Sequence, residues 1–233
     1  MQVKKFFSKH QGVVALTSGA AVDFTPVDFD APLTDLQRSF LYRQTGIDIP
    51  QVFWRKQIHG DDILAASGGA ASVRGCADAD AFITKEKNLP IAIRTADCVP
   101  VFILDPVRHA VGLAHAGWKG TAKSIAAKTV QRMEARYGSQ PSDLKISLGP
   151  CIRQCCYQVG KEFYEHFSAH LHRRDGYIYA DMIGANRDQL LQAGVRQENI
   201  FDSGICTCCN TTYFSFRREG AKAGRMISLM MLI

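Results

Sequence analysis

Short apolar runs that are bounded by turn residues recur along most of the chain. In the middle, four such runs follow one another closely, and Asp105-Pro106 provides a turn between the last two. Because nearly every position in these four runs is apolar, we expect strands that are covered on both faces. The runs that predict strands are residues 13–17, 51–58, 81–84, 91–95, 99–104, 110–114, 145–148, 199–205, 213–217 and 225–233.

Four other segments have apolar residues at helical spacing. The clearest follows Gly120, where Ile125, Val130 and Met133 share one face and Gly138 provides a stop. The predicted helices are residues 32–46, 121–137, 161–171 and 181–193. Strands and helices are mixed without a regular βαβ alternation, which favours an α+β fold over a doubly wound sheet.

The composition supports one well-filled core. The chain has 233 residues, of which 46% are hydrophobic and 21% charged, and this excludes a disordered or fibrous protein. A chain of this length suits one large domain or two small ones. Since no repeat, low-complexity tract or linker marks a boundary, we expect one domain over residues 1–233.

The net charge is mildly positive, at +6, with 28 Lys and Arg against 22 Asp and Glu. Because the basic residues are scattered, we expect anionic small molecules rather than nucleic acid as partners. No apolar run reaches the roughly 18 residues that span a bilayer, and residues 8–12 interrupt the apolar start before a signal sequence can form. We therefore expect a soluble cytoplasmic protein without a membrane partner, and nothing in the sequence specifies its oligomeric state.

Three segments place a metal-capable side chain at the end of a predicted strand, and they carry His59, Cys98 and His115. Strand ends can aim side chains into one cleft, and two imidazoles with one thiolate form a zinc-binding set that leaves the fourth position open. The separations are too long for a local motif, so ordinary buried residues remain the alternative. Asp97 is a candidate proton carrier or orienting residue, with a turn-forming carboxylate as the alternative.

Eight cysteines are compatible with disulfides, a metal site or reduced thiols. Since a cytoplasmic protein keeps its thiols reduced, we expect no disulfide framework. Cys76 has no assigned role. Six others lack a pair of Cys-x2-Cys knuckles, so we expect reduced packing thiols, with a structural metal site as the weaker alternative. These six are Cys151, Cys155, Cys156, Cys206, Cys208 and Cys209.

Six motifs resemble those of the YfiH/laccase-domain family. The resemblance covers residues 51 to 233 and implies a single-domain, four-layer αββα sandwich, related to the catalytic domain of cytotoxic-necrotising-factor toxins, which are cysteine hydrolases. It also implies that His59, Cys98 and His115 are the zinc ligands. Residues 1–50 are atypical, because an Arg that many relatives carry there is missing. The motifs are Gln57-Ile58-His59-Gly60, Asp78-Ala79-Asp80-Ala81, Thr95-Ala96-Asp97-Cys98-Val99-Pro100, His115-Ala116-Gly117-Trp118-Lys119-Gly120, Gly149-Pro150-Cys151-Ile152 and Phe214-Ser215-Phe216-Arg217-Arg218-Glu219-Gly220 with Gly224-Arg225.

The resemblance further implies a purine nucleoside phosphorylase for adenosine, inosine and methylthioadenosine that also has adenosine deaminase activity. Zinc would activate water for attack on C6 of adenine, and phosphorolysis would need cations that hold phosphate. In strand geometry Arg217 and Arg218 face opposite sides, so at most one is expected to line a given cleft. The candidate cations in the matched motifs are Lys119, Arg217, Arg218 and Arg225.

Three alternatives stay open. Cys98 can act as a nucleophile with His115 as its base, in a cysteine or zinc amidase that edits peptidoglycan precursors. Older descriptions of the family name copper polyphenol oxidases, and Cu2+ can occupy a His/Cys set, although seven His with one His-x-His pair are few for a multicopper centre. A binding module with structural zinc ranks below the enzymes, since the motifs offer no fourth ligand.

Overall fold

The computed structural model describes residues 3–26, 31–68 and 78–233, and Cys76 lies outside these ranges. Two larger sheets and one small sheet form its framework. The four-stranded sheet has the order β1 (Val3–Lys5), β2 (Val13–Ser18), β13 (Met226–Leu232), β5 (Ile91–Thr95). The six-stranded sheet has the order β12 (Ile200–Asp202), β8 (Lys145–Leu148), β6 (Val99–Asp105), β7 (Ala110–Ala116), β4 (Ala81–Thr84), β3 (Ile63–Ala65). The small sheet has the order β10 (Leu171–Arg174), β11 (Tyr177–Ala180), β9 (Gln158–Val159).

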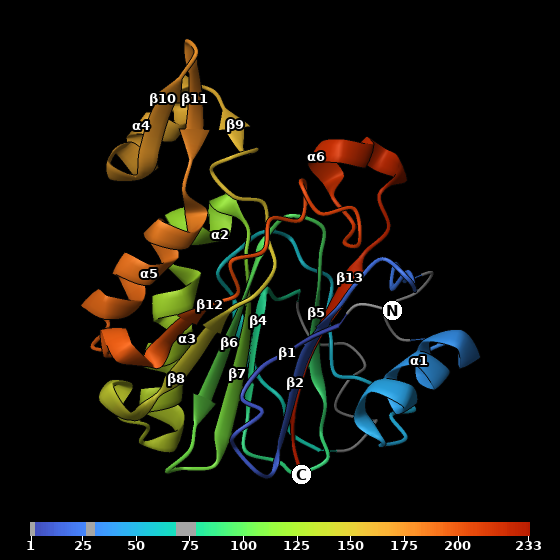
Figure 1. Cartoon of the computed structure of the whole chain (residues 1–233). Coiled ribbons are helices and arrows are strands. Elements are labelled where there is room, and N and C mark those ends of the chain that lie inside the picture. The colour runs from blue at the N-terminus through green and yellow to red at the C-terminus, as the bar shows by residue number, and fades with distance from the viewer. Residues whose placement is uncertain (1–2, 27–30, 69–77) are drawn as a thin grey trace.

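Helices cover the outer faces of the two larger sheets, which pack against each other (Figure 1). α3 (Ile125–Tyr137) and α5 (Met182–Gln192) cover the six-stranded sheet, and α1 (Asp35–Thr45) covers the four-stranded sheet. The result is a four-layer α+β sandwich, which confirms the predicted fold class. β2 lies in the middle of the four-stranded sheet, so residues from the atypical first fifty help to form these layers.

Alternating side chains on the central strands fill three separate apolar layers. On β6, Val101 and Ile103 pack toward the helices while Phe102 packs between the sheets. On β13, Met230 enters the layer between the sheets and Leu229 packs on the side of α1. Both faces of these strands are therefore buried, as the continuous apolar runs predicted.

Several element boundaries differ from the predictions. The predicted helix over 121–137 is two helices, α2 (Trp118–Ala122) and α3, because Ser124 adopts a left-handed φ of 63° between them. The predicted helix over 161–171 is only a series of short turns around α4 (Tyr164–Phe167). The predicted strand over 213–217 is also wrong, since Ser215 caps a short helix, α6 (Phe216–Glu219), by accepting the Arg218 N–H.

The segment 51–58 was predicted as a strand but forms only one β-bridge, between Phe53 and Ile91. It runs beside β5, where the side chain of Gln57 takes the place of a strand backbone. Its amide donates to the Arg94 carbonyl at 2.8 Å, and its Oε1 accepts the Arg94 N–H at 2.8 Å. The Gln57 side chain thus satisfies the backbone N–H and carbonyl of Arg94 at the edge of β5. The backbone after Gln57 does not have to continue as a strand and can turn at His59.

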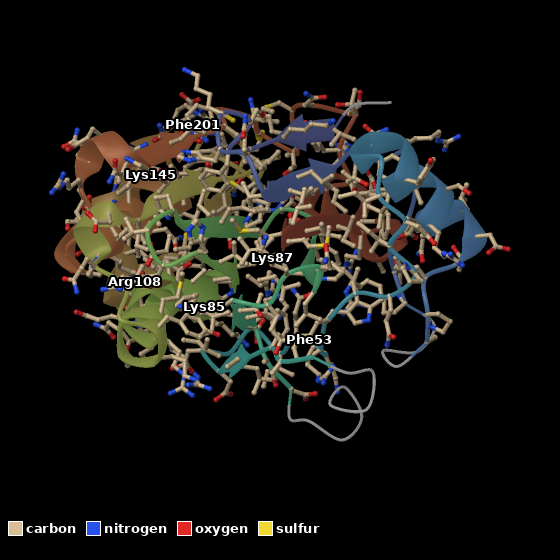
Figure 2. All side chains as sticks on the ribbon, turned by 90° about the horizontal axis from the view of Figure 1, so that it is seen from below. Phe53, Lys85, Lys87, Arg108, Lys145 and Phe201 are labelled. Atoms are coloured by element: carbon tan, nitrogen blue, oxygen red, sulfur yellow. The ribbon has the colours of Figure 1, made fainter. Side chains whose placement is uncertain are left out.

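The strand register shows which residues lie at each end of the six-stranded sheet. The start of β6 pairs with the end of β7, through Val99 with Ala116 and Pro100 with His115. Lys85, Arg108 and Lys145 belong to the opposite end, which Figure 2 shows from below. Among the residues that the structure describes, no helix is long and apolar enough to cross a membrane.

Candidate active site and metal centre

His59, Cys98 and His115 lie together at one end of the six-stranded sheet. Cys98 immediately precedes β6 and His115 is near the end of β7, so the pairing of these strands brings them together. His59 lies in the loop that precedes β3. One ligand atom from each of the three residues lies within 4.8 Å of the others, and the two imidazole rings are 4.9 Å apart at 71°. The three sequence-predicted ligands therefore form one cluster.

The buried carboxylate of Asp80 holds two of these ligands. Its Oδ1 lies 2.7 Å from Nδ1 of His115, which leaves Nε2 of that ring to face the cluster. The same carboxylate accepts the backbone N–H groups of Ile58, His59 and Gly60 at 3.0, 3.1 and 2.7 Å. These bonds hold His59 at a left-handed φ of 59°, a conformation that costs energy for a residue with a side chain.

The motif Asp78-Ala79-Asp80-Ala81 contains Asp80, but no role for this residue was predicted. Its position directly before the apolar strand β4 could have indicated a role, because a buried carboxylate needs a hydrogen-bond partner. Burial alone would raise the pKa of Asp80, but the hydrogen bond and charge of His115 and the Gly60 and Ile58 N–H groups lower it. Asp80 therefore stays ionised and favours a protonated or metal-bound His115.

Two glycines allow close approach of the segments around the cluster. A Cβ on Gly117 would lie 2.8 Å from Cδ2 of His59 and 3.2 Å from Sγ of Cys98. A Cβ on Gly120 would lie 2.9 Å from the backbone oxygen of Gly60. The spacing of the motif Gly117-Trp118-Lys119-Gly120 thus packs α2 directly against the loop that carries His59.

The charges of Cys98 and His115 stabilise each other. Burial opposes ionisation of both, but the charge of His115 and hydrogen bonds from His115 and His59 lower the pKa of Cys98 to about 6. Burial likewise opposes the charge on His115, and Cys98 with Asp80 raises its pKa to about 9. A thiolate beside an imidazolium is therefore the stable state of the metal-free cluster between these two values.

The cluster opens into a cleft of about 740 Å³ that is lined by residues of α2 and α6. Both helices lie in the upper half of Figure 1. This volume suits a small-molecule ligand. Aromatic side chains on its wall include Trp118, Tyr157 and Phe216. Burial, then the charge of Cys98, raises the pKa of Tyr157, so its hydroxyl keeps its proton.

Three arginines line the cleft, and two of them were predicted. Arg217 and Arg225 are on the wall as expected, whereas Arg94 was missed. Arg94 is a buried cation in the apolar strand β5, and its guanidinium carbon lies 5.1 Å from the centroid of the Trp54 ring. A charged residue inside such an apolar run could have indicated a functional role. Burial and then the charge of Arg225 lower the pKa of Arg94 to about 10, so an anion in the cleft would relieve a repulsion between two guanidinium groups.

The other two predicted cations do not line this cleft. Lys119 does not line the cleft, and its Nζ lies over the ring of Trp118, at 5.6 Å from the centroid. Arg218 donates instead to the backbone carbonyls of Thr207, Cys208 and Tyr213. Although the two adjacent arginines are on a helix rather than a strand, only Arg217 of the pair faces the cleft.

Asp97 is engaged as a hydrogen-bond acceptor on both oxygens. Oδ1 accepts the Thr207 hydroxyl at 2.6 Å, and Oδ2 accepts the Ser215 hydroxyl at 3.1 Å and the Arg217 N–H at 2.7 Å. Asp97 also adopts a left-handed φ of 94°. These contacts hold the segment before Cys98 against α6. They fit a role for Asp97 in orienting its neighbours better than a role in carrying a proton.

The ligand set fits a catalytic zinc ion. Two imidazoles and a thiolate are the donor types that zinc prefers, and three protein ligands leave one position for water or substrate. Asp80 supplies the carboxylate that a metal-bound histidine normally meets through its second ring nitrogen. Cu2+ also accepts such donors, so the set alone does not select the metal.

Comparison with known proteins extends these observations. The family described as multi-copper polyphenol oxidoreductase laccase matches residues 5–233. This chain belongs to that family. The resemblance inferred from the motifs is thereby confirmed, and the match includes most of the first fifty residues.

Relatives of this laccase-family chain bear two enzyme names. It is 33% identical over 189 residues to a purine nucleoside phosphorylase of Clostridium acetobutylicum, covering 79% of this chain and 78% of the relative. It is 33% identical over 204 residues to an adenosine deaminase of an unknown prokaryotic organism, covering 81% and 78%. The crystal structure of YlmD from Geobacillus stearothermophilus superimposes with a TM-score of 0.83 at 28% identity, covering 97% and 93% of the two chains.

Only part of the prediction for the six remaining cysteines agrees with the structure. Cys151 is buried, and burial raises its pKa well above the ordinary value, as suits a packing thiol. Cys155 and Cys209 are exposed, so the packing interpretation is wrong for these two.

The thiolate state of Cys98 is testable by alkylation of the chelator-treated protein across pH. We expect the rate at Cys98 to be half-maximal near pH 6, because the lowered pKa keeps the thiolate at neutral pH and only acid protonates it. Iodoacetamide labelling followed by peptide mass spectrometry measures this rate, and buried Cys151 should remain unlabelled. A rate that rises only near pH 9 would show that His115 does not stabilise the thiolate.

Substitution of the carboxylate behind His115 should weaken metal binding. Asp80→Asn removes the charge that orients the imidazole, and we expect a loss of roughly 10–100-fold in zinc affinity. Competition with a chromophoric chelator measures the affinity, with circular dichroism as a check of folding. The matched control is Asp61→Asn, since the carboxylate of Asp61 pairs with the exposed Lys123 and Lys128 rather than with a ligand of the cluster. Equal affinity in the two variants would contradict the role of Asp80.

Proposed function

We propose that this chain is a zinc-dependent purine nucleoside phosphorylase for adenosine, inosine and methylthioadenosine, with adenosine deaminase activity at the same site. The observation that carries the proposal is one cleft that combines an open three-ligand set with Arg94, Arg217 and Arg225. The names of the relatives support the same pair of activities. A purine nucleoside and phosphate are the proposed small-molecule partners.

His59, Cys98 and His115 would hold the zinc ion, with Asp80 fixing the ring of His115. Zinc in such an open set supplies Lewis-acid polarisation and activates water near neutral pH. The thiolate of Cys98 is favoured before any metal binds, so little energy is needed to deprotonate this ligand.

For phosphorolysis, the arginines would bind and orient the phosphate. A phosphate oxygen forms the bond to C1′ of the ribose as the C1′–N9 bond breaks, and the purine leaves with the electron pair and takes up a proton. Guanidinium groups suit this task because they bind two phosphate oxygens at once and stay charged. Asp97 would act as a positioning residue, since it holds the N–H of Arg217 and thereby α6 at the cleft.

For deamination, the oxygen of a water molecule forms a bond to C6 of adenine, and the bond from C6 to the exocyclic nitrogen breaks. One proton of this water stays on N1, and the other leaves with the ammonia. The aromatic walls formed by Trp118, Tyr157 and Phe216 suit stacking on a purine ring. Tyr157 keeps its proton and can donate a hydrogen bond to a ring nitrogen or a ribose hydroxyl. One bound nucleoside can therefore react with phosphate at C1′ of its ribose or with water at C6 of its base.

A specific observation also favours a second candidate, a cysteine amidase. Cys98 and His115 form a thiolate–imidazolium pair, which is the activated state of a cysteine nucleophile. The substrate would be an amide such as a peptidoglycan precursor. A copper oxidase is less favoured, because among the described residues the two clusters of metal-capable side chains contain at most two imidazoles each.

A product assay with adenosine, with and without phosphate, distinguishes these activities. We expect adenine and ribose-1-phosphate when phosphate is present, and inosine with ammonia in either condition. Cys98→Ala should lower both rates at least about 100-fold, because it removes a ligand of the open site. Full activity of Cys98→Ala would reject the site, and hydrolysis of an amide substrate by zinc-free protein would favour the amidase.

The phosphate subsite is testable through Arg225. Arg225→Gln should raise KM for phosphate roughly 10–100-fold, because a charge-assisted hydrogen bond contributes about 1.5–3 kcal/mol. Adenosine deamination, which uses no phosphate, should change far less. The control is Arg108→Gln at the opposite end of the sheet (Figure 2). An unchanged phosphate KM in Arg225→Gln would place the anion elsewhere.

A further inference from the structure

A second group of metal-capable side chains lies on two loops outside the proposed ligand set. Cys155 and Cys156 belong to the loop after β8, and Cys206 and Cys209 belong to the loop after β12. The two loops are tied together by an isolated bridge between Cys151 and Cys206. Residues more than fifty positions apart in the chain thus form one cluster, which no role in the proposed reaction explains.

The four sulfur atoms are arranged around a common centre. All four Sγ atoms lie within 4.8 Å of one another, with Cys156 and Cys155 at 3.2 and 3.6 Å from Cys209. A zinc tetrahedron with Zn–S bonds of ~2.3 Å has sulfur–sulfur edges of roughly 3.8 Å. The two separations to Cys209 are slightly shorter than that edge, and the 4.8 Å limit on the other pairs includes it. Both separations to Cys209 exceed the ~2.05 Å of a disulfide bond.

The loop that carries Cys206 has the form of a metal knuckle. Cys206 and Cys209 are three residues apart, and sequence analysis considered these cysteines without using that spacing. The backbone N–H groups of Cys208 and Cys209 are directed at Sγ of Cys206, and a third comes from Arg153 on the facing loop. The backbone of both loops therefore surrounds the sulfur of Cys206.

We propose that Cys155, Cys156, Cys206 and Cys209 bind a structural zinc ion, separate from the ion held by His59, Cys98 and His115. Four thiolates form a closed set, which is the structural rather than the catalytic kind of zinc site. Zinc also explains why two of the cysteines lie at the surface, since a thiol there would gain little from packing.

The proposed zinc site holds groups that shape the cleft. Thr207, inside the knuckle, donates to Asp97 at 2.6 Å, and Arg218 donates to the carbonyls of Thr207 and Cys208. Arg217 donates to the carbonyl of Cys156 at 3.3 Å. The zinc ion would therefore fix both loops against α6 and the segment before Cys98. Its role is one of positioning, without contact to substrate.

Cobalt substitution tests the proposal in the Cys98→Ser variant, in which the His/Cys/His set lacks its thiolate. Protein purified with reductant and reconstituted with Co2+ should show the thiolate charge-transfer and d–d bands of a tetrahedral tetrathiolate site, and the zinc-loaded form should retain one zinc per chain after dialysis. Reduced thiols without those bands would overturn the proposal. A Cys156–Cys209 disulfide in the reduced preparation, seen by mass spectrometry, would overturn it as well.

A pair of neighbouring substitutions in the same knuckle locates the ion. Cys209→Ser should lose one zinc per chain and the tetrathiolate bands. Cys208→Ser should keep both, because Cys208 contacts Cys156 but is not one of the four cysteines whose sulfur atoms all lie within 4.8 Å of one another. Equal zinc content in these two variants would overturn the assignment. If Cys209→Ser does not fold, the spectrum of the Cys98→Ser protein decides the question without it.

Discussion

The buried carboxylate of Asp80 organises the centre of this molecule. It accepts three consecutive backbone N–H groups from the loop of His59 and one ring nitrogen from His115, and it is completely shielded from solvent. A buried charge of this kind is tolerable only when its hydrogen bonds are satisfied, and each of these partners is a proposed metal ligand or its neighbour in the chain. The same interactions that make the acid stable therefore fix the geometry of the ligands.

A second carboxylate performs a comparable task on the other side of the cleft. Asp97 joins the segment before Cys98 to α6 and to the loop that contains Thr207. The sheet supplies rigid strand ends, and Asp80 and Asp97 hold the irregular segments against these ends through hydrogen bonds. This division explains how three ligands and several arginines from distant parts of the chain meet in one cleft.

The layers of the fold were predictable because their signal is local. Continuous apolar runs mark β6 and β7, and the capping box of Thr34 with Gln37 and the left-handed Gly46 delimit α1. The clustering of His59, Cys98 and His115 was predictable from strand ends and motifs. Asp80 and Arg94 were not assigned, because their roles depend on contacts between segments that sequence spacing does not reveal. The turn at Ser124 and the helix α6 also depend on tertiary contacts, which override local propensity.

The three proposed ligands come from segments that meet only when both the sheet and the loop of His59 have formed. The unfolded chain has no equivalent site, so a bound metal ion stabilises the native state by mass action, by about 2.7 kcal/mol when free metal is 100-fold above its dissociation constant. Net stability of a domain is only about 5–15 kcal/mol. The amount of folded protein in a cell would thus follow the supply of metal, and scarcity would act on its abundance as well as on its catalysis.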